Sequence, residues 1–420
     1  MSPRNAAVGP VAAVVVLALS VTSSSAADRG HAGTQRAMDA LVAQARVPGV
    51  LGQAEDGGGM WHGASGVADR SSGRPRLAGD RFRIGSVTKT FVATVLLQLE
   101  AEGRLDLDDP VERWLPGRVR GNGHDGRRIT VRALLNHTSG VADFTADPGY
   151  RRLLGPGFLP HRYETHRPGE LVRRAMRHPP LFPPGTGWAY SNTNYVLAGM
   201  VVEAVTGRGY AAEIERRVLR PLGLRRTTLP GTSPVIRGRH GRAYSALPGG
   251  GTGRRAVDVT RLDPSLAGAA GEMVSTTGDL LVFLRELLGG RLLPPRQLAA
   301  MTDTVPTGGR ARFEGYGLGL WSLRLSCGTR VWGHDGDIHG SGTTAVTTRD
   351  GTHTAVFNRN GDWAADRDTE LLEAEYCQGR TGPSGAAPPR TPAAPGRPRP
   401  SAPCAPRRPA APATRTASPG

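Results

Sequence analysis

Ser86 and Lys89 are the first residues in this sequence whose types and spacing could do chemistry. Positions i and i+3 of a helix lie on one face, and an apolar run over 91–99 predicts a buried helix that begins near Ser86. A serine hydroxyl is a weak nucleophile until a base removes its proton. A buried lysine can be that base because burial lowers its pKa, whereas an arginine keeps its proton in proteins. The pair therefore predicts a serine nucleophile that is activated by a lysine.

The rarity of lysine adds weight to this pair. The 420 residues contain 53 lysines and arginines together, and Lys89 is the single lysine among them. A Ser-x-x-Lys spacing alone is a weak motif. Here the only side-chain amine of the chain stands three residues after a serine at the head of an apolar helix. We therefore interpret the pair as functional rather than structural.

A second candidate segment is Tyr190-Ser191-Asn192, which follows a Pro-Pro-Gly loop and precedes a helical pattern. Alternate residues of an extended segment point the same way, so the phenol of Tyr190 and the amide of Asn192 are expected to face one cleft. Tyr190 could move a proton, and Asn192 could hold a substrate amide or the lysine. Taken alone, such a segment is more often a surface turn.

The third candidate is His334-Asp335-Gly336, which we expect at the end of a strand over 329–332. A glycine there would let a substrate backbone lie against the strand edge. The N–H groups of Asp337 and Ser86 could together form an oxyanion hole. A metal site is the alternative interpretation, with His334, Asp335, Asp337 and His339 as ligands, but no further ligand cluster supports it.

The elements that must position these residues follow a simple order along the chain. Strand patterns stand at both ends and helical patterns fill the middle, which predicts one antiparallel sheet completed by both chain ends, with a helical insertion. The expected strands lie within 50–67 and at 329–332, 343–348 and 352–357, and the clearest helices are 34–45, 197–205, 279–288 and 363–376.

The two ends of the chain differ from this core. Residues 1–26 have a positive start, an apolar stretch and small residues before a cleavage site, which predicts a signal peptide and a secreted, extracellular protein with no membrane span after cleavage. Residues 379–420 are rich in Pro, Ala and Arg and predict a disordered tail. The range 27–378 is then expected to form one domain.

The net charge of +17 raises nucleic acid as a partner. The tail carries +7 of that charge, and the +9 of the core is spread singly with no basic stripe interleaved with aromatic residues, so we expect no nucleic-acid binding. The tail could contact an anionic cell envelope weakly, although a solvated spacer is the simpler interpretation.

Taken together, the three motifs in this order resemble the serine β-lactamase and penicillin-binding superfamily, most closely secreted Streptomyces-type D-alanyl-D-alanine carboxypeptidases. The resemblance covers about 33–378, and further segments agree with it: 66–70, 96–99, 134–140, 190–195 and 316–320. It implies a mixed α/β fold of the α+β type, in which an antiparallel sheet flanked by helices meets an all-helical subdomain at the active-site cleft.

The resemblance also implies roles for the residues. Ser86 would be acylated, Lys89 would activate it, and Tyr190 would pass the proton to the leaving group. Asn192 and His334 would line the cleft. No cofactor and no metal would be needed, and the ligands would be D-Ala-D-Ala peptides or β-lactams bound by a monomer.

Two positions depart from the peptidase pattern and leave the substrate open. Asp335 stands where the peptidases have a threonine, and Trp321 stands where they have an arginine that binds the substrate carboxylate. Both changes should weaken carboxylate recognition. D-Ala-D-Ala carboxypeptidase activity is the leading hypothesis. A β-lactamase or an esterase/amidase is the alternative, and a non-catalytic penicillin-binding protein would contradict the intact Ser86 and Lys89.

The resemblance finally implies a disulfide between Cys327 and Cys377, because related enzymes have cysteines at the same two places. The third cysteine, Cys404, lies in the tail.

Overall fold

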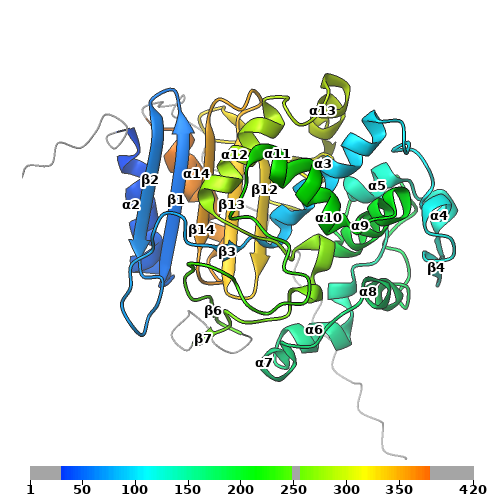
Figure 1. The fold of residues 1–420 in the computed structure, drawn as a ribbon, viewed down its shortest axis with the longest axis horizontal. Helices are drawn as coiled ribbons and strands as arrows, with labels where there is room; N and C mark the ends of the chain where they lie inside the picture. The colour runs from blue at the N-terminus through cyan, green and yellow to red at the C-terminus, as the bar shows by residue number, and fades with distance from the viewer. Residues whose placement is uncertain (1–29, 248–255, 379–420) are drawn as a thin grey trace, which may run out of the picture. The chain divides into compact units, whose positions relative to one another are not determined.

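The computed structural model describes residues 30–247 and 256–378 (Figure 1). The predicted signal peptide, the predicted tail and Cys404 lie outside these residues, so the structure says nothing about them. Within the described ranges, no helix is both long enough and apolar enough to cross a membrane.

The core of the structure is one antiparallel sheet of eight strands, in the order β2-β1-β14-β13-β12-β11-β10-β9. The N-terminal strand β1 pairs with β14 from the C-terminal part, with Val50 opposite Arg359. The prediction of one sheet completed by both chain ends is therefore confirmed. The strands are β1 (Gly49–Asp56), β2 (Gly59–Gly66), β9 (Val305–Pro306), β10 (Gly315–Tyr316), β11 (Trp321–Arg324), β12 (Arg330–Ile338), β13 (Ser341–Thr347) and β14 (Thr354–Arg359).

Helices cover both faces of this sheet, which explains why β13 and β14 are buried along their whole length. On one face, α2 (Ala32–Ala45) and α14 (Asp368–Tyr376) pack with an apolar cluster that includes Val346 and Ala355. On the other face, α12 (Thr277–Leu288) packs with a larger cluster that includes Ala345 and Val356. The alternation of neighbouring residues between two clusters is the period-two pattern of a strand buried on both sides.

A helical region beside the sheet makes up the rest of the fold (Figure 1). Its centre is the pair α3 (Thr88–Ala101) and α9 (Asn192–Thr206), and α3 is buried almost all round, as its apolar pattern predicts. Phe91 of α3 stacks on Phe283 of α12 with 3.7 Å between ring centroids, which ties the helical region to the sheet. The other helices are α4 (Val111–Trp114), α5 (Val131–Leu135), α6 (Pro148–Leu154), α7 (Phe158–His161), α8 (Pro168–Ala175), α10 (Tyr210–Ile214), α11 (Arg220–Leu222) and α13 (Pro295–Thr302).

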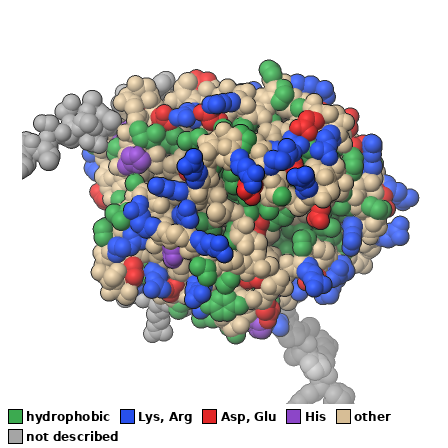
Figure 2. All heavy atoms as spheres, viewed as in Figure 1, with side chains coloured by type: hydrophobic (Ala, Val, Ile, Leu, Met, Phe, Trp, Pro, Cys, Tyr) green, Lys and Arg blue, Asp and Glu red, His purple; other side chains and the backbone are tan. Residues whose placement is uncertain are grey.

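Three short strand pairs interrupt the helical region: β3 (Phe82–Arg83) with β8 (Val274–Ser275), β4 (Arg120–Gly121) with β5 (His124–Asp125), and β6 (Tyr244–Ser245) with β7 (Val257–Asp258). On the face drawn in Figure 2, arginines are scattered among acidic and apolar side chains rather than gathered in one stripe.

Two predicted elements differ from the structure. Strand β12 continues to Ile338, so His334, Asp335 and Gly336 lie inside the strand and not at its end. Two glycines weaken its strand pattern, but pairing with β13 over 332–338 supplies the missing stability. The last helix begins at Asp368 rather than Trp363, after a short 3₁₀ turn at Ala365–Arg367.

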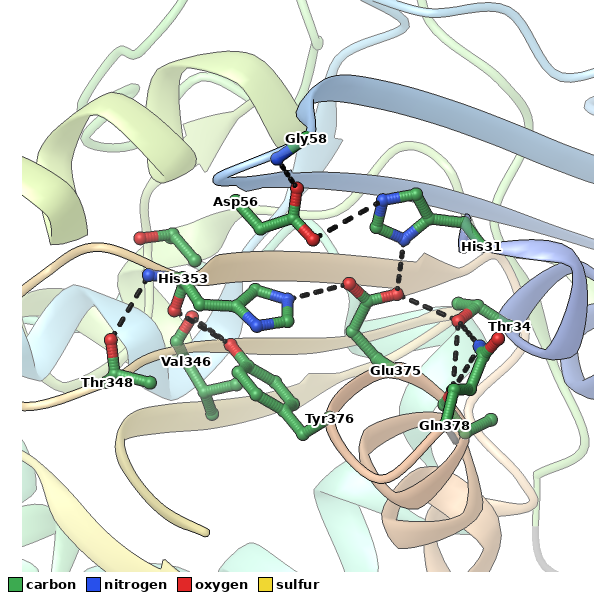
Figure 3. Close-up of polar contacts among 12 residues, drawn as sticks. His31, Thr34, Asp56, Gly58, Val346, Thr348, His353, Glu375, Tyr376 and Gln378 are labelled. Carbon is green, nitrogen blue, oxygen red and sulfur yellow. Dashed lines mark hydrogen bonds and ion pairs between the residues drawn. The ribbon is translucent and has the colours of Figure 1, made fainter. Parts of the chain in front are cut away.

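A buried carboxylate joins the first and last described helices (Figure 3). Glu375 of α14 accepts a hydrogen bond from the Thr34 hydroxyl at 2.8 Å. Its two oxygens also lie 3.0 Å from His31 Nδ1 and 2.8 Å from His353 Nε2. Next to it, a disulfide joins Cys327 to Cys377 across a sequence separation of 50 residues. In the chain-entropy model a loop of that length contributes about 4 kcal/mol to stability.

We expect Glu375→Gln to destabilise the protein near neutral pH and much less in acid. Burial alone would raise the pKa of Glu375, but hydrogen bonds from His31, His353 and Thr34 outweigh burial and lower the pKa from 4.5 to about 2. A lowered carboxyl pKa stabilises the fold above the unfolded value and loses that effect as the pH falls, so on the order of 3 kcal/mol disappears between about pH 4.5 and 2. Urea unfolding at about pH 7 and 3 measures this change. Glu370→Gln, at an exposed ion pair on the same helix, is the control, and an equal cost at both pH values would contradict the prediction.

Candidate active site

Ser86 lies in a single 3₁₀ turn, Gly85–Val87, that leads directly into α3. Ser86 is partly exposed, whereas Gly85 and Val87 on either side of it are buried. Gly85 has φ +50°, and a Cβ at that position would lie 2.9 Å from the Asp337 nitrogen of β12. The turn therefore holds the serine hydroxyl at the surface while its backbone presses against the central sheet.

Lys89 is fully buried one helical turn after Ser86. Its Nζ lies 2.7 Å from Ser86 Oγ, and it donates to Asn192 Oδ1 at 2.9 Å and to the Ala270 carbonyl at 2.7 Å. Burial lowers the pKa of Lys89 from 10.5 to about 7, although Asp143 and Asp335 act in the opposite direction. A substantial share of this amine is thus neutral near pH 7 and can take the serine proton.

Tyr190 stands on the other side of the nucleophile. Its ring centroid is 4.9 Å from Lys89 Nζ, and burial raises the pKa of its phenol well above 10.0, while a hydrogen bond with Ser86 acts the other way. The phenol therefore stays protonated and can give a proton to a leaving group. Tyr190 and Asn192 share the site, but not as one extended segment: Ser191 stands at the N-cap position of α9, and Asn192 is the first residue of that helix.

Two residues that the motif analysis did not single out hold this arrangement. Asp143 accepts a hydrogen bond from Asn192 Nδ2 at 3.1 Å, which leaves Asn192 Oδ1 facing Lys89. The buried ring of His137 lies against Tyr190 with 4.3 Å between centroids, and its Nδ1 accepts the Ser191 N–H at 3.3 Å. His137 is a positioning residue, and its place inside the segment 134–140 was the available sequence signal.

Strand β12 approaches the nucleophile so closely that only glycine fits at position 336. A Cβ there would lie 2.0 Å from the Ile84 carbonyl oxygen and 2.7 Å from the Ser86 nitrogen. This contact brings the backbone of Asp337 beside the backbone of Ser86. Their two N–H groups are the ones that we expect to stabilise an oxyanion.

Two of the predicted cleft residues are buried and do not line the cleft around Ser86. His334 is 1% exposed, with its Nε2 2.7 Å from the Tyr316 hydroxyl, because strand alternation points it away from Asp335 and Asp337. Trp321 is also 1% exposed and donates its indole N–H to Asp335 Oδ1 at 2.9 Å. Neither side chain lines the hollows around Ser86, so each acts on the site through a neighbour.

Both acidic residues of β12 carry an arginine partner. Arg312 lies 2.7 Å from Asp335, and Arg359 lies 2.6 Å from Asp337. Burial would raise the pKa of Asp335, but Arg312 and other neighbours lower it below 3.8. Asp335 is therefore ionised, and Arg312 balances its charge. Asp335 should then weaken the recognition of a substrate carboxylate less than the sequence predicts.

The four residues of the alternative metal site do not converge. His339 stacks on Phe158 at 3.6 Å and bonds the Leu154 carbonyl, away from the arginine-paired aspartates. In the part of the chain that the structure describes, no group of three His, Cys, Asp or Glu side chains could hold a metal ion.

Two hollows meet at Ser86. The first, called here the acyl hollow, has a volume of about 290 Å³ and is lined mainly by apolar residues, among them Phe144, Leu154, Leu266, Ala267 and Ile338. The second, called here the leaving-group hollow, has a volume of about 520 Å³ and is lined by Trp188, Tyr190, Arg310, Phe313 and Asp335. Tyr190, the expected proton donor, lines only the second hollow, and for this reason we assign the leaving group to it.

Comparison with known proteins agrees with this geometry. The family model described as Beta-lactamase matches residues 34–377. Esterase EstB of Burkholderia gladioli is 33% identical over 311 residues, covering 65% of this chain and 77% of that protein. Penicillin-binding protein 4 of Amycolatopsis lactamdurans is 31% identical over 350 residues, covering 78% of this chain and 87% of the relative.

A solved structure, that of a D-stereospecific amidohydrolase from Streptomyces sp., is 54% identical with a TM-score of 0.77, covering 83% of this chain and 98% of the other. The predicted fold is thereby confirmed as well. Since the family model spans most of the sequence, the chain belongs to the beta-lactamase family of serine hydrolases.

Proposed function

We propose that the protein is a serine amidohydrolase that cleaves amides of apolar D-amino acids through an acyl-enzyme on Ser86. One observation carries the proposal: Asp335 and Asp337, which line the leaving-group hollow, are paired with Arg312 and Arg359, which do not line it. Neither arginine is therefore available to a free terminal carboxylate, and a neutral leaving group fits better. The D-stereospecific amidohydrolase that this chain is similar to supports the substrate class.

The geometry supports a two-step reaction. Neutral Lys89 takes the Ser86 proton while Oγ attacks the amide carbonyl, and the N–H groups of Ser86 and Asp337 stabilise the oxyanion. The C–N bond then breaks, the leaving amine takes a proton from Tyr190, and Lys89 returns a proton to Tyr190. In the second step, water attacks the acyl carbonyl and gives a proton to Lys89 or Tyr190. The bond between the acyl carbon and Ser86 Oγ then breaks, Oγ takes a proton back from the same groups, and the amino acid leaves.

The acyl hollow fits the side chain of such a substrate. Its lining is mostly apolar, and Asp337 also borders it with a side chain that is 48% exposed. An apolar side chain would lie among Phe144, Leu266 and Ile338, and the substrate's α-ammonium would share the Asp337 carboxylate with Arg359.

D-Ala-D-Ala carboxypeptidase remains a second candidate because of Arg310. This residue lines the leaving-group hollow and donates Nη1 to the Trp188 carbonyl at 2.8 Å. Its positive charge therefore stands on the side of the cleft where a terminal carboxylate would bind.

A substrate panel tests the two candidates. We expect kcat/KM for D-phenylalanine amide to exceed that for L-phenylalanine amide and for a D-Ala-D-Ala peptide by about tenfold or more. Arg310→Gln should leave amide hydrolysis unchanged. Preference for the peptide, with selective loss of that activity in Arg310→Gln, would favour the carboxypeptidase and overturn our proposal.

A further inference from the structure

A separate cavity, called here the second cavity, lies next to the acyl hollow and is distinct from the leaving-group hollow. It has a volume of about 240 Å³, and its lining includes Leu171, Val196, Met200, Tyr210 and Glu272. A cavity of this size is below the usual range for drug-sized ligands, so it fits a small molecule.

One polar group of this cavity, which His166, Arg167 and Glu203 also line, is a buried carboxyl group. Glu272 is 2% exposed, and Tyr210 donates its hydroxyl to Glu272 Oε1 at 2.5 Å. Glu272 also accepts the backbone N–H of Gly231, and the positive charge of the buried Arg83 acts on it. Among the described residues, however, no cation forms a direct ion pair with Glu272, although buried carboxylates are normally paired with one. Burial raises the pKa of Glu272 from 4.5 to about 7.

The wall between this cavity and the active site is one short segment. Gly268, Ala269 and Glu272 line the second cavity, whereas Ala270 and Gly271 line the acyl hollow. The Ala270 carbonyl in this wall accepts the Lys89 hydrogen bond at 2.7 Å. The two spaces are therefore neighbours with separate linings, and a ligand of the second cavity would touch neither Ser86 nor Asp337.

We propose that this cavity is a second binding site, which takes a small alkyl or arylalkyl amine with its ammonium group paired to Glu272 and its apolar body against Leu171, Val196 and Met200. The ammonium supplies a cation in direct contact with the buried carboxyl group, and the apolar part of the lining covers the rest of the ligand. This site does not depend on the proposed amidohydrolase activity.

Benzylamine and its neutral analogue benzyl alcohol test the proposal by titration calorimetry on the full chain. We expect saturable benzylamine binding, weakened about tenfold or more by Glu272→Gln, because that change removes the partner of a buried charge. Benzyl alcohol should bind more weakly and be little affected by the same variant. Asp337→Asn, the matched change in the active-site cleft, should leave benzylamine affinity within about twofold.

A cavity-filling variant, Met200→Trp, keeps Glu272 and should abolish binding of both compounds. If Glu272→Gln does not fold, this variant alone tests whether the compounds bind in the second cavity. Loss of benzylamine binding in Asp337→Asn would place the amine in the catalytic cleft and overturn the proposal. Equal weakening of both compounds by Glu272→Gln, unchanged binding in Met200→Trp, or no saturable binding to the wild type would also overturn it.

Discussion

Replacing Lys89 by arginine should lower the rate of Ser86 acylation by about a thousandfold or more, although the positive charge is kept. The reason is that arginine stays protonated and cannot accept the serine proton. The wild-type rate should rise with pH through about 7, because the pKa of Lys89 is lowered to about 7 by burial and the neutral amine is the active form. Stopped-flow acylation by a chromogenic ester or penicillin measures both effects.

Lys89→Met is the companion variant, since its unbranched side chain is only one heavy atom shorter and it removes both charge and base. Circular dichroism and thermal unfolding of the two variants show whether the buried site still folds. A folded Lys89→Arg protein that acylates within about tenfold of the wild-type rate would rule out the lysine as the base.

Gly336→Ala should lower kcat/KM by roughly a hundredfold to a thousandfold, which is the usual cost of losing one oxyanion donor. The added Cβ would lie 2.0 Å from the Ile84 carbonyl oxygen and 2.7 Å from the Ser86 nitrogen, so β12 must move away from the nucleophile. That movement separates the N–H groups of Ser86 and Asp337. Steady-state hydrolysis of an activated ester measures the loss.

Gly333→Ala is the matched control on the same strand. Its Cβ would also meet backbone, 2.0 Å from the Ala345 oxygen, but on the side of β13 and not of Ser86. Both variants should distort β12 and lower the stability of the protein. Only Gly336→Ala should also lower the activity of the molecules that remain folded. Equal losses per folded molecule in the two variants would mean that the approach at Gly336 has no special role in catalysis.

The parts of the site that were predictable from sequence are those set by local spacing. Ser86 and Lys89 share a helix start, so a three-residue interval was enough to bring Oγ and Nζ to 2.7 Å. The sheet was predictable for a similar reason: strand patterns at both ends of the chain have few ways to bury their faces except by pairing, as β1 and β14 do.

The remaining features depend on which way a side chain points and what it meets far along the chain. Alternation within β12 buries His334, but the strand's true length was hidden by its glycines. The Arg312–Asp335 pair joins residues on different elements, and no spacing rule predicts it. For the same reason, the support that Asp143 gives to Asn192 appears only once the helical region is folded.

The pairing of β1 with β14 also determines the order in which parts of the sheet can form during synthesis. Val50 finds its partner Arg359 roughly 300 residues later, so the hairpin of β1 and β2 is made long before its sheet exists. At ~5–20 residues per second, translation of the intervening chain takes about 15–60 s. During that interval one edge of β1 has no native neighbour, and such edges invite aggregation. The same edge is unpaired in the complete chain until β14 pairs with β1. We therefore expect refolding at high protein concentration to lose yield steeply, and a holdase that covers this hairpin to restore the yield.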